Sequence, residues 1–303
     1  MKYIKEVYPG LRISALTLGT WVYGGENWGG SDDRESLNAI HAALDAGVTC
    51  IDTAPVYGQG QAETLVGQAI KGRRDKVIIA TKCGLIRQGR RVMINLKAVS
   101  IRSEVEQSLR RLGTEYIDVY QCHWPDPKTP LEETMSAMCK LQGEGKIRHI
   151  GVSNFSSEQL KEAMTYTAVF SAQSQLSALT QDILRELLPF CRKEGLAVFA
   201  YGALGGGLLT GKYAVPPVLD KADARSFFYK FYTGAPFQKA QAVLDAFRKI
   251  GRPINQTAIN WARQQAGVSS VVVGCRTAQQ VNDNMAAADW DLSDEELEGI
   301  GRL

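Results

Sequence analysis

Four residues of this 303-residue chain carry side chains that together could move a proton: Asp52, Tyr57, Lys82 and His123. A lysine ammonium beside a phenol stabilises the phenolate and lowers the pKa of the phenol, and a nearby carboxylate keeps the lysine charged. A phenol tuned in this way can protonate a carbonyl oxygen while a hydride reaches the carbon. His123 could hold that oxygen by a hydrogen bond. The four residues therefore predict general acid catalysis on a carbonyl group.

Asp52 and Lys82 alone also fit a structural ion pair that closes a barrel. Burying such a pair costs desolvation energy, so the pair is weak evidence for stability. Tyr57 follows Asp52 by five residues in the turn Ala-Pro-Val-Tyr-Gly, and His123 ends the next β-rich run after Lys82. These two placements favour the catalytic interpretation.

Short β-rich runs alternate with longer segments of helical period along the whole chain. The predicted strands are 15–19, 48–52, 77–81, 117–122, 149–153, 168–173, 196–201 and 270–274. The predicted helices are 33–46, 62–71, 102–112, 131–143, 156–164, 182–194, 239–250, 257–266 and 278–287. Eight such alternations predict a (β/α)8 TIM barrel, as one domain over residues 1–303, with a doubly wound sheet as the second choice. In a barrel, the site lies at the C-terminal ends of the strands, where the four residues stand.

Helix ends carry recognisable signals. Asp32 precedes the first helical pattern and Gly47 follows it as a stop. Ser156 and Gln159 have the spacing of a capping box. Before the first strand, segments 3–7 and 11–14 flank Pro-Gly and predict a short N-terminal β-hairpin.

The composition fits an enzyme of the cytoplasm. It is 45% hydrophobic and 22% charged, with no apolar run of membrane-spanning length and no signal-peptide pattern at the N-terminus. The net charge of +3 is spread evenly, which argues against a nucleic-acid partner. Six cysteines without a C-x-x-C motif and only three histidines argue for reduced thiols and against a metal site.

Two segments lie outside the alternation, 21–30 and 214–236. The second contains five aromatic residues within the six positions 227–232. Long loops after barrel strands usually shape the pocket, so we expect a substrate-pocket or oligomer contact here; a solvated loop is the alternative. Trp21 and Trp124 are the predicted substrate contacts.

Several motifs resemble the aldo-keto reductase superfamily, and the resemblance covers the whole chain. They are LGTW at 18–21, IDTA at 51–54 with YG at 57–58, ATK at 80–82, SLRRL at 108–112, YIDV at 116–119, HWPD at 123–126, GKIR at 145–148, GVSNF at 151–155 and GLLTGKY at 207–213. Each is weak alone, but their order is specific. The branch resembled is the bacterial one that is also similar to potassium-channel β subunits and perakine-type reductases.

The resemblance implies roles for residues at matching positions. Tyr57 would be the general acid, Lys82 and Asp52 would tune it, and His123 would orient the carbonyl. The implied cofactor-binding residues are Ser153, Asn154 and Gln173 at the nicotinamide carboxamide, Tyr201 stacked on the nicotinamide, Leu204, Gly207, Leu209 and Lys212 along the pyrophosphate, and Gly274, Arg276, Thr277, Gln280 and Asn284 around the adenosine phosphate.

The segment 274–284 implies NADPH as cofactor. Arg276 and Thr277 match the positions that take the 2′-phosphate at a helix N-terminus. Gln280 stands where many relatives have arginine, so NADH stays open as a weaker alternative. No G-x-G-x-x-G follows the first strand, which argues against a Rossmann-type site.

The sequence leaves two other functions open. One is a nicotinamide-binding regulatory subunit, and the other is a lyase that forms a Schiff base on Lys82. The expected partner of the reductase is a small-molecule carbonyl substrate of unspecified kind, and the protein could be a monomer or a homo-oligomer.

Overall fold

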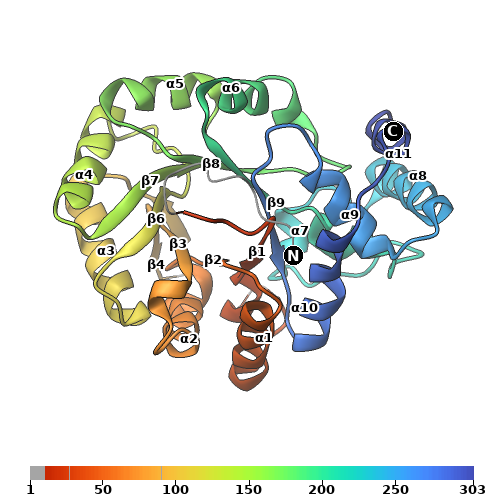
Figure 1. The fold of residues 1–303 in the computed structure, drawn as a ribbon, viewed down its shortest axis with the longest axis horizontal. Coiled ribbons are helices and arrows are strands. Elements are labelled where there is room, and N and C mark those ends of the chain that lie inside the picture. Colours follow the sequence, from red (N-terminus) through yellow and green to blue (C-terminus); the bar gives the residue numbers. More distant parts are fainter. Residues whose placement is uncertain (1–10, 27, 90) are drawn as a thin grey trace.

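Eight parallel strands close into a barrel with helices around it (Figure 1). The computed structural model describes residues 11–26, 28–89 and 91–303. Around the barrel the strands follow the order β1 (Leu16–Gly19), β10 (Ser270–Gly274), β9 (Ala197–Tyr201), β8 (Ser171–Gln175), β7 (Ile147–Ser153), β6 (Ile117–Cys122), β3 (Ile78–Cys83) and β2 (Cys50–Asp52). The predicted (β/α)8 barrel is confirmed. Most of the predicted hairpin at 3–14 lies outside the described residues.

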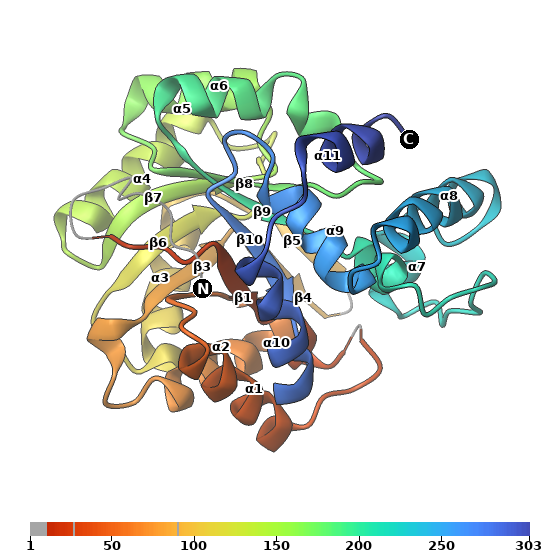
Figure 2. The ribbon, with the colours of Figure 1, turned by 45° about the vertical axis from the view of Figure 1, so that its right-hand side comes forward.

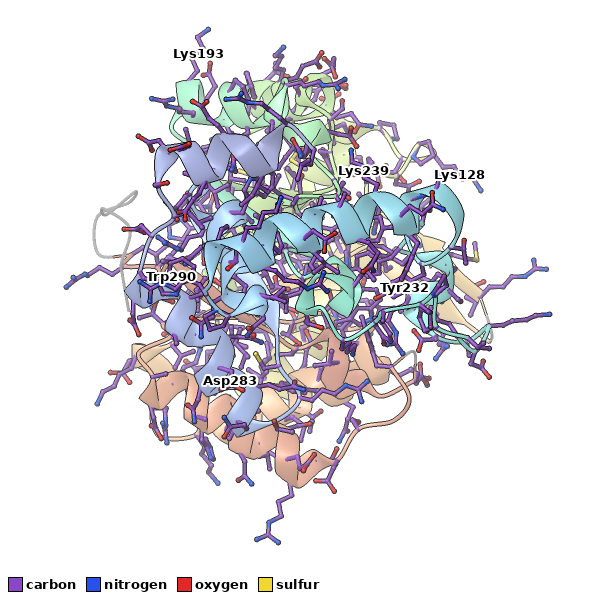
Figure 3. All side chains as sticks on the ribbon, turned by 90° about the vertical axis from the view of Figure 1, so that its right-hand side faces the viewer. Lys128, Lys193, Tyr232, Lys239, Asp283 and Trp290 are labelled. Carbon is purple, nitrogen blue, oxygen red and sulfur yellow. The ribbon has the colours of Figure 1, made fainter. Side chains whose placement is uncertain are left out.

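Helices connect successive barrel strands and cover the outside of the barrel (Figures 1 and 2). They are α1 (Asp33–Asp45), α2 (Gln61–Ala69), α3 (Ala98–Leu112), α4 (Leu131–Gly143), α5 (Ser157–Tyr166), α6 (Leu187–Glu194), α7 (Ala224–Phe227), α8 (Gly234–Ile250), α9 (Ile254–Arg263), α10 (Ala278–Met285) and α11 (Asp294–Gly301). Short 3₁₀ turns are η1 (Trp21–Gly24), η2 (Tyr57–Gly60), η3 (Arg74–Lys76), η4 (Asp182–Leu184), η5 (Gly205–Thr210) and η6 (Ala286–Asp289). Helix α8 lies to one side of the barrel, with Tyr232 beneath it (Figure 3).

The predicted helix ends are confirmed. The side chain of Asp32 accepts a hydrogen bond from the backbone N of Glu35 at 2.8 Å, and Gly47 ends the α1 region with φ +86°. Ser156 and Gln159 form a reciprocal capping box at α5.

Some elements differ from the prediction. The hairpin β4 (Leu85–Gln88) and β5 (Arg91–Ile94) pairs outside the barrel, and its residues are mostly exposed, so no buried pattern marks it in the sequence. Helix α11 was also not predicted. The predicted helix 182–194 is divided into η4 and α6 because Pro189 fits only the first turn of a helix.

Alternate residues along the strands belong to two separate apolar clusters. Ile51, Ile79 and Val198 pack in the larger cluster with the helices, whereas Cys50 and Ala80 belong to the smaller one. Successive side chains of a strand point to opposite faces, so the smaller cluster fills the inside of the barrel. Within the described ranges, no helix is both long and apolar enough to cross a membrane.

The turns η1 and η2 touch backbone to backbone at the rim of the barrel. A Cβ added to Gly24 would lie 2.4 Å from the backbone N of Gly58, and one added to Gly58 would lie 2.6 Å from the Cα of Gly24. Gly58 also has φ +59°, a left-handed conformation. This contact fixes Tyr57, the first residue of η2, against Trp21, the first residue of η1.

We predict that Gly58→Ala destabilises the fold more than Gly72→Ala does. Gly72 has φ +77° and no atom within 4 Å of an added Cβ, so alanine there meets only the left-handed strain, about 1 kcal/mol. At Gly58 the methyl group must also separate two backbones, for a total of about 3 kcal/mol. Urea unfolding measures both; equal losses in the two variants would show that the turns are not held by this contact.

Candidate active site

Four side chains from neighbouring parts of the barrel meet at its C-terminal rim. Asp52 is the last residue of β2, Lys82 lies near the end of β3, and His123 directly follows β6. These strands are adjacent and parallel, so their carboxyl ends share one rim. Tyr57 begins η2, in the loop after β2.

The ammonium of Lys82 is the centre of this group. Its Nζ lies 2.6 Å from Asp52 Oδ1, 3.0 Å from the carbonyl oxygen of Thr53 and 3.3 Å from the hydroxyl oxygen of Tyr57. The Lys82 side chain is fully buried. Each of its three N–H groups therefore has a partner, and one partner is the phenol that would act as the acid.

Burial sets the protonation behaviour of this group. It lowers the pKa of Lys82, while Asp52 opposes that effect. It raises the pKa of Tyr57 well above the ordinary value of a phenol, and the negative charge of Asp52 adds to the rise. The net shift is therefore upward and not the predicted lowering, because removing the phenol from water disfavours its charged form. Tyr57 holds a proton at neutral pH.

His123 is buried beside Tyr57. The centroids of the two rings are 5.9 Å apart, and the ring planes meet at 82°. Burial, assisted by the charge of Lys82, lowers the pKa of His123 well below its ordinary value. A neutral imidazole next to the phenol can donate one hydrogen bond to a carbonyl oxygen.

The second oxygen of Asp52 is held by two glutamine amides. Gln173 Nε2 lies 2.7 Å and Gln121 Nε2 3.4 Å from Asp52 Oδ2. With Lys82 on Oδ1, the carboxylate has donors on both oxygens, which fixes its orientation. Gln121 was not predicted as a site residue. The signal available in the sequence was a polar residue within the buried strand 117–122; its pairing with Lys82 comes only from the structure.

Asn154 joins three strand ends. Its Nδ2 donates to the carbonyl oxygen of His123 at 3.0 Å and to Ser153 Oγ at 3.1 Å, and its Oδ1 accepts from the hydroxyl of Tyr201 at 2.7 Å. The backbone of Asn154 is left-handed, with φ +61°, a conformation that asparagine tolerates better than most residues. The structure thus links the predicted nicotinamide residues directly to His123, one of the four predicted catalytic residues.

Aromatic rings cover the phenol. Trp21 stacks on Tyr57 with centroids 6.0 Å apart and an interplanar angle of 24°, and Trp28 meets Trp21 edge-on at 5.2 Å. Trp124 follows His123 and is half-buried; among the described residues it has no ring-stacking partner. Trp21 therefore lies at the phenol of Tyr57, and Trp124 lies next to His123 in the chain.

The segment predicted to lie along the pyrophosphate forms η5. The carbonyl oxygen of Leu204 accepts from the backbone N of both Gly207 and Leu209, at 2.9 and 3.0 Å. Gly207 has φ +100°, and the ammonium of Lys212 would lie 3.5 Å from a Cβ added to it. The turn thus brings the ammonium of Lys212 close to the half-buried backbone of Gly207.

The segment after β10 places Arg276 across from the β1 loop. Its guanidinium donates to the carbonyl oxygen of Trp28, and its backbone N donates to Gln280 Oε1 at 2.8 Å. Thr277 caps α10 by accepting from the backbone N of Gln280 at 3.2 Å. Gly274 ends β10 and is exposed.

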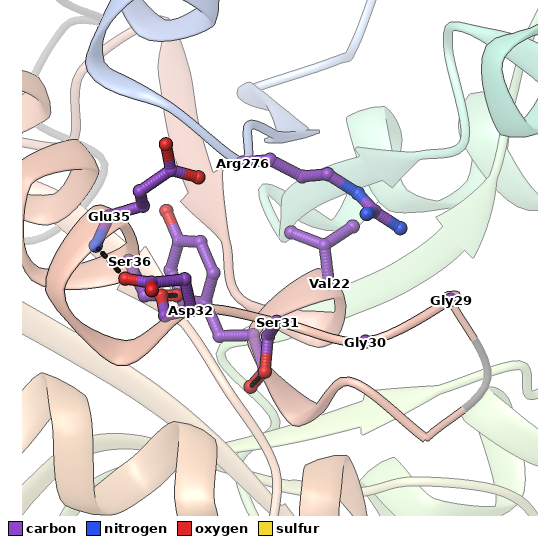
Figure 4. A pocket seen from close by; sticks show the side chains of 9 residues that line it. Val22, Gly29, Gly30, Ser31, Asp32, Glu35, Ser36 and Arg276 are labelled. Carbon is purple, nitrogen blue, oxygen red and sulfur yellow. Dashed lines mark hydrogen bonds between the residues drawn. The ribbon is translucent and has the colours of Figure 1, made fainter.

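Asn284 lies deeper in the same segment. It is buried, donates to Cys275 Sγ at 3.3 Å and accepts from Asn255 Nδ2 at 2.8 Å. A pocket of about 350 Å³ lies between Arg276 and the start of α1 (Figure 4). Its lining residues are Val22, Tyr23, Gly29, Gly30, Ser31, Asp32, Glu35, Ser36 and Arg276. It is separate from the residues around Lys82.

The residues expected to hold a nicotinamide cofactor fit such a group. Gln173 uses its N–H group on Asp52, and its Oε1 has no partner among the described residues and is not shut away from solvent. That oxygen suits the amide N–H of a carboxamide. The glycine-rich turn at Gly207 and the cation of Lys212 suit a pyrophosphate.

Comparison with known proteins decides the family. A family model described as "Aldo/keto reductase family" matches residues 15–303. The chain is 35% identical to the "NADH-specific methylglyoxal reductase" of Escherichia coli (strain K12), over 97% of this chain and 95% of that protein.

The chain belongs to the aldo/keto reductase family.

Two solved structures of similar proteins agree with the fold. The glycerol dehydrogenase AKR11B4 from Gluconobacter oxydans has a TM-score of 0.89 and 39% identity, covering 99% of this chain and 94% of that one. An aldo/keto reductase from Klebsiella pneumoniae, in complex with NADP and acetate, has a TM-score of 0.76 and 31% identity, covering 100% and 95%. The present chain is thus an oxidoreductase of this family.

In this aldo/keto reductase, the buried carboxyl group of Glu104 contacts the backbone just after β3. Glu104 of α3 accepts from the backbone N of Gly84 at 3.0 Å and from Ser100 Oγ at 3.1 Å. Burial raises the pKa of Glu104 to about 7, and the charge of Glu63 adds to the rise. Glu104 therefore keeps its proton in the folded protein at pH values where the unfolded chain has lost it.

We predict that Glu104 makes the protein less stable as pH rises. Between the unfolded pKa of 4.5 and the folded pKa of about 7, the folded state binds more protons than the unfolded state. Stability is therefore lost with rising pH, by about 3 kcal/mol in total. Glu104→Gln should remove that part of the pH dependence, so that the variant exceeds the wild type in unfolding free energy at pH 8 but not at pH 4.

Urea unfolding at both pH values measures this difference. Glu106→Gln on the same helix is the control, because Glu106 forms a partly exposed ion pair with Lys146. Loss of this ion pair in Glu106→Gln should lower the free energy of unfolding by at most about 1 kcal/mol at pH 8. A Glu104→Gln variant with the pH dependence of the wild type would contradict the assignment.

Proposed function

We propose that this protein reduces an aldehyde or ketone to an alcohol, with NADPH as hydride donor and Tyr57 as general acid, in one catalytic domain spanning residues 1–303. The observation that carries the proposal is the position of Lys82 Nζ, 2.6 Å from Asp52 and 3.3 Å from the Tyr57 hydroxyl. A buried ammonium shared between a carboxylate and a phenol serves no packing purpose that an apolar side chain would not serve better.

The residues act on the carbonyl oxygen. A nicotinamide cofactor supplies the hydride that adds to the carbonyl carbon. His123 donates a hydrogen bond to the carbonyl oxygen and orients it. Tyr57 transfers its phenolic proton to that oxygen as the new C–H bond forms, so the product is a neutral alcohol. Lys82 then stabilises the phenolate until water returns a proton to Tyr57.

Gln173, Asn154, Ser153 and Tyr201 support the proposed nicotinamide position. Asn154 bonds both to the His123 carbonyl and to Tyr201. Gln173 bonds to Asp52. A nicotinamide ring stacked on Tyr201 would therefore be held by residues that also position the proposed acid, and this arrangement supports the proposal.

The cofactor preference rests on Arg276 and Thr277 at the start of α10. A 2′-phosphate can take the place of the Trp28 carbonyl as the partner of Arg276, with Thr277 and the helix N-terminus beside it. The Klebsiella structure with NADP supports this preference. NADH is the weaker alternative, because Gln280 replaces a second cation and the Escherichia coli relative is named NADH-specific.

The lyase alternative has little support. A Schiff base on Lys82 needs a neutral, accessible amine, but the side chain is fully buried and bonds to Asp52, Thr53 and Tyr57. The regulatory-subunit alternative needs no proton donor, whereas all four catalytic residues are assembled in this chain.

We predict that Tyr57→Phe lowers kcat at least about 100-fold, because it removes the transferred proton. The dissociation constant of NADPH should stay within about twofold, since the ring and its packing remain. Steady-state kinetics with butanal and a fluorescence titration with NADPH measure the two quantities.

Tyr23→Phe is the matched control for that variant. Tyr23 is a buried tyrosine of the neighbouring turn η1, and its hydroxyl has no partner in the described structure. The kcat of Tyr23→Phe should match that of the wild type. Turnover retained in Tyr57→Phe would remove Tyr57 from the role of acid.

We predict that Arg276→Leu raises the dissociation constant of NADPH at least about tenfold, through loss of a charge-assisted bond to the 2′-phosphate. The dissociation constant of NADH should change less than about twofold, because NADH has no 2′-phosphate. Arg302→Leu, at an exposed ion pair with Glu298, is the control and should change neither. Equal weakening of both cofactors by Arg276→Leu would argue for a structural role of the Arg276–Trp28 contact.

A further inference from the structure

The segment between η5 and α8 holds several aromatic rings that point in different directions. Tyr229 and Tyr232 are buried in a cluster with Leu208 of η5 and with Phe237 and Ala240 of α8. These rings hold the segment against the body of the protein. The aromatic loop predicted from the sequence is therefore packed and not solvated.

Close contacts fix the path of the segment on both sides of Phe228. A Cβ added to Gly206 would lie 2.7 Å from the ring of Tyr229, so glycine is needed for the ring to lie there. The hydroxyl of Tyr232 donates to the carbonyl oxygen of Gly206 at 2.9 Å. Before Phe228, Arg225 donates to the Tyr213 hydroxyl at 2.6 Å.

Phe228 points from this anchored segment toward the catalytic residues. Its ring meets Trp21 edge-on, with centroids 5.3 Å apart at 77°, and lies 6.4 Å from the ring of Tyr201. Trp21 in turn stacks on Tyr57. Phe228 thus connects the ring that covers the acid with the ring proposed to stack on the nicotinamide.

The neighbouring Phe227 behaves differently. Its side chain is 58% exposed, and no ring contact to it is found within the described part of the chain. Of these two adjacent phenylalanines, Phe228 therefore faces the catalytic rim and Phe227 faces solvent. This pair allows a matched comparison.

We propose that Phe228 is a specificity-determining residue that limits the substrate to short, uncharged aliphatic aldehydes and ketones. A carbonyl compound must present its oxygen to Tyr57 and its carbon to a nicotinamide on Tyr201, so its substituents extend into the space bounded by Trp21 and Phe228. In this proposal, a short alkyl chain lies beside these rings. A fused aromatic substituent would compete with the Phe228 ring for the space beside Trp21 and Tyr201.

The charge of this space agrees with that substrate class. The rings that meet around Phe228 are Trp21, Tyr201 and Tyr229. Burial raises the pKa of both tyrosines, so all three rings are neutral at physiological pH. The inference rests on the proposed function, because it names the substrate class of that same site.

The test compares wild type, Phe228→Ala and Phe227→Ala with butanal and 2-naphthaldehyde in the presence of NADPH. In Phe228→Ala, the ratio of kcat/KM for 2-naphthaldehyde to kcat/KM for butanal should rise at least about tenfold. A change of this size is typical when the shape of an apolar pocket changes. Phe227→Ala should keep the ratio of the wild type. Phe228→Leu, which retains apolar packing, should give a smaller rise of the same sign if the alanine variant does not fold.

A binding measurement without turnover accompanies the kinetics. Calorimetry of 2-naphthylmethanol with the NADPH-loaded protein, in which an alcohol cannot be oxidised, should show about tenfold tighter binding in Phe228→Ala. A folded Phe228 variant that keeps the wild-type kcat/KM ratio for the two aldehydes and the wild-type affinity for 2-naphthylmethanol overturns this inference. The proposed function would still stand. A wild type that binds NADPH but reduces neither aldehyde overturns the proposed function instead.

Discussion

The ion pair between Lys82 and Asp52 is the constraint on which the rest of the structure depends. Two opposite charges are buried at the barrel rim, and leaving either one unpaired would cost about 3–5 kcal/mol. The surrounding polar groups are arranged to prevent this. Gln121 and Gln173 bond to the free carboxylate oxygen, and the carbonyl of Thr53 bonds to the ammonium. The pair therefore needs donors and acceptors from several strands at once.

This requirement explains why the site sits in a closed barrel. Strands β2, β3, β6 and β8 contribute Asp52, Lys82, Gln121 and Gln173, and only a curved sheet brings side chains from nonadjacent strands such as β2 and β8 to one carboxylate. The apolar cluster inside the barrel lies below these side chains and excludes water from that end. The phenol of Tyr57 joins the group from a loop, where the contact between Gly24 and Gly58 sets its position.

Much of this arrangement was predictable because strand ends coincide with the ends of β-rich runs. Asp52, Lys82 and His123 could be assigned to one rim from that rule alone. Gln121 could not, since its role depends on the register between β3 and β6. The aromatic segment 227–232 could be expected at the pocket, but the choice of Phe228 within it could not, since the path of a long loop is set by distant contacts such as that of Tyr229 with Gly206. The direction of the pKa shift of Tyr57 depends on burial, which no spacing in the sequence reveals.

Asn154 has a consequence for how the sequence can change over evolution. All the polar atoms of its amide are engaged, two bonds being donated to His123 O and Ser153 Oγ and one accepted from Tyr201. Aspartate would lose both donated bonds, and glutamine is too long and adapts poorly to φ +61°. Substitution at position 154 is therefore tied to the residue at position 201, and the two positions should vary together among homologous chains.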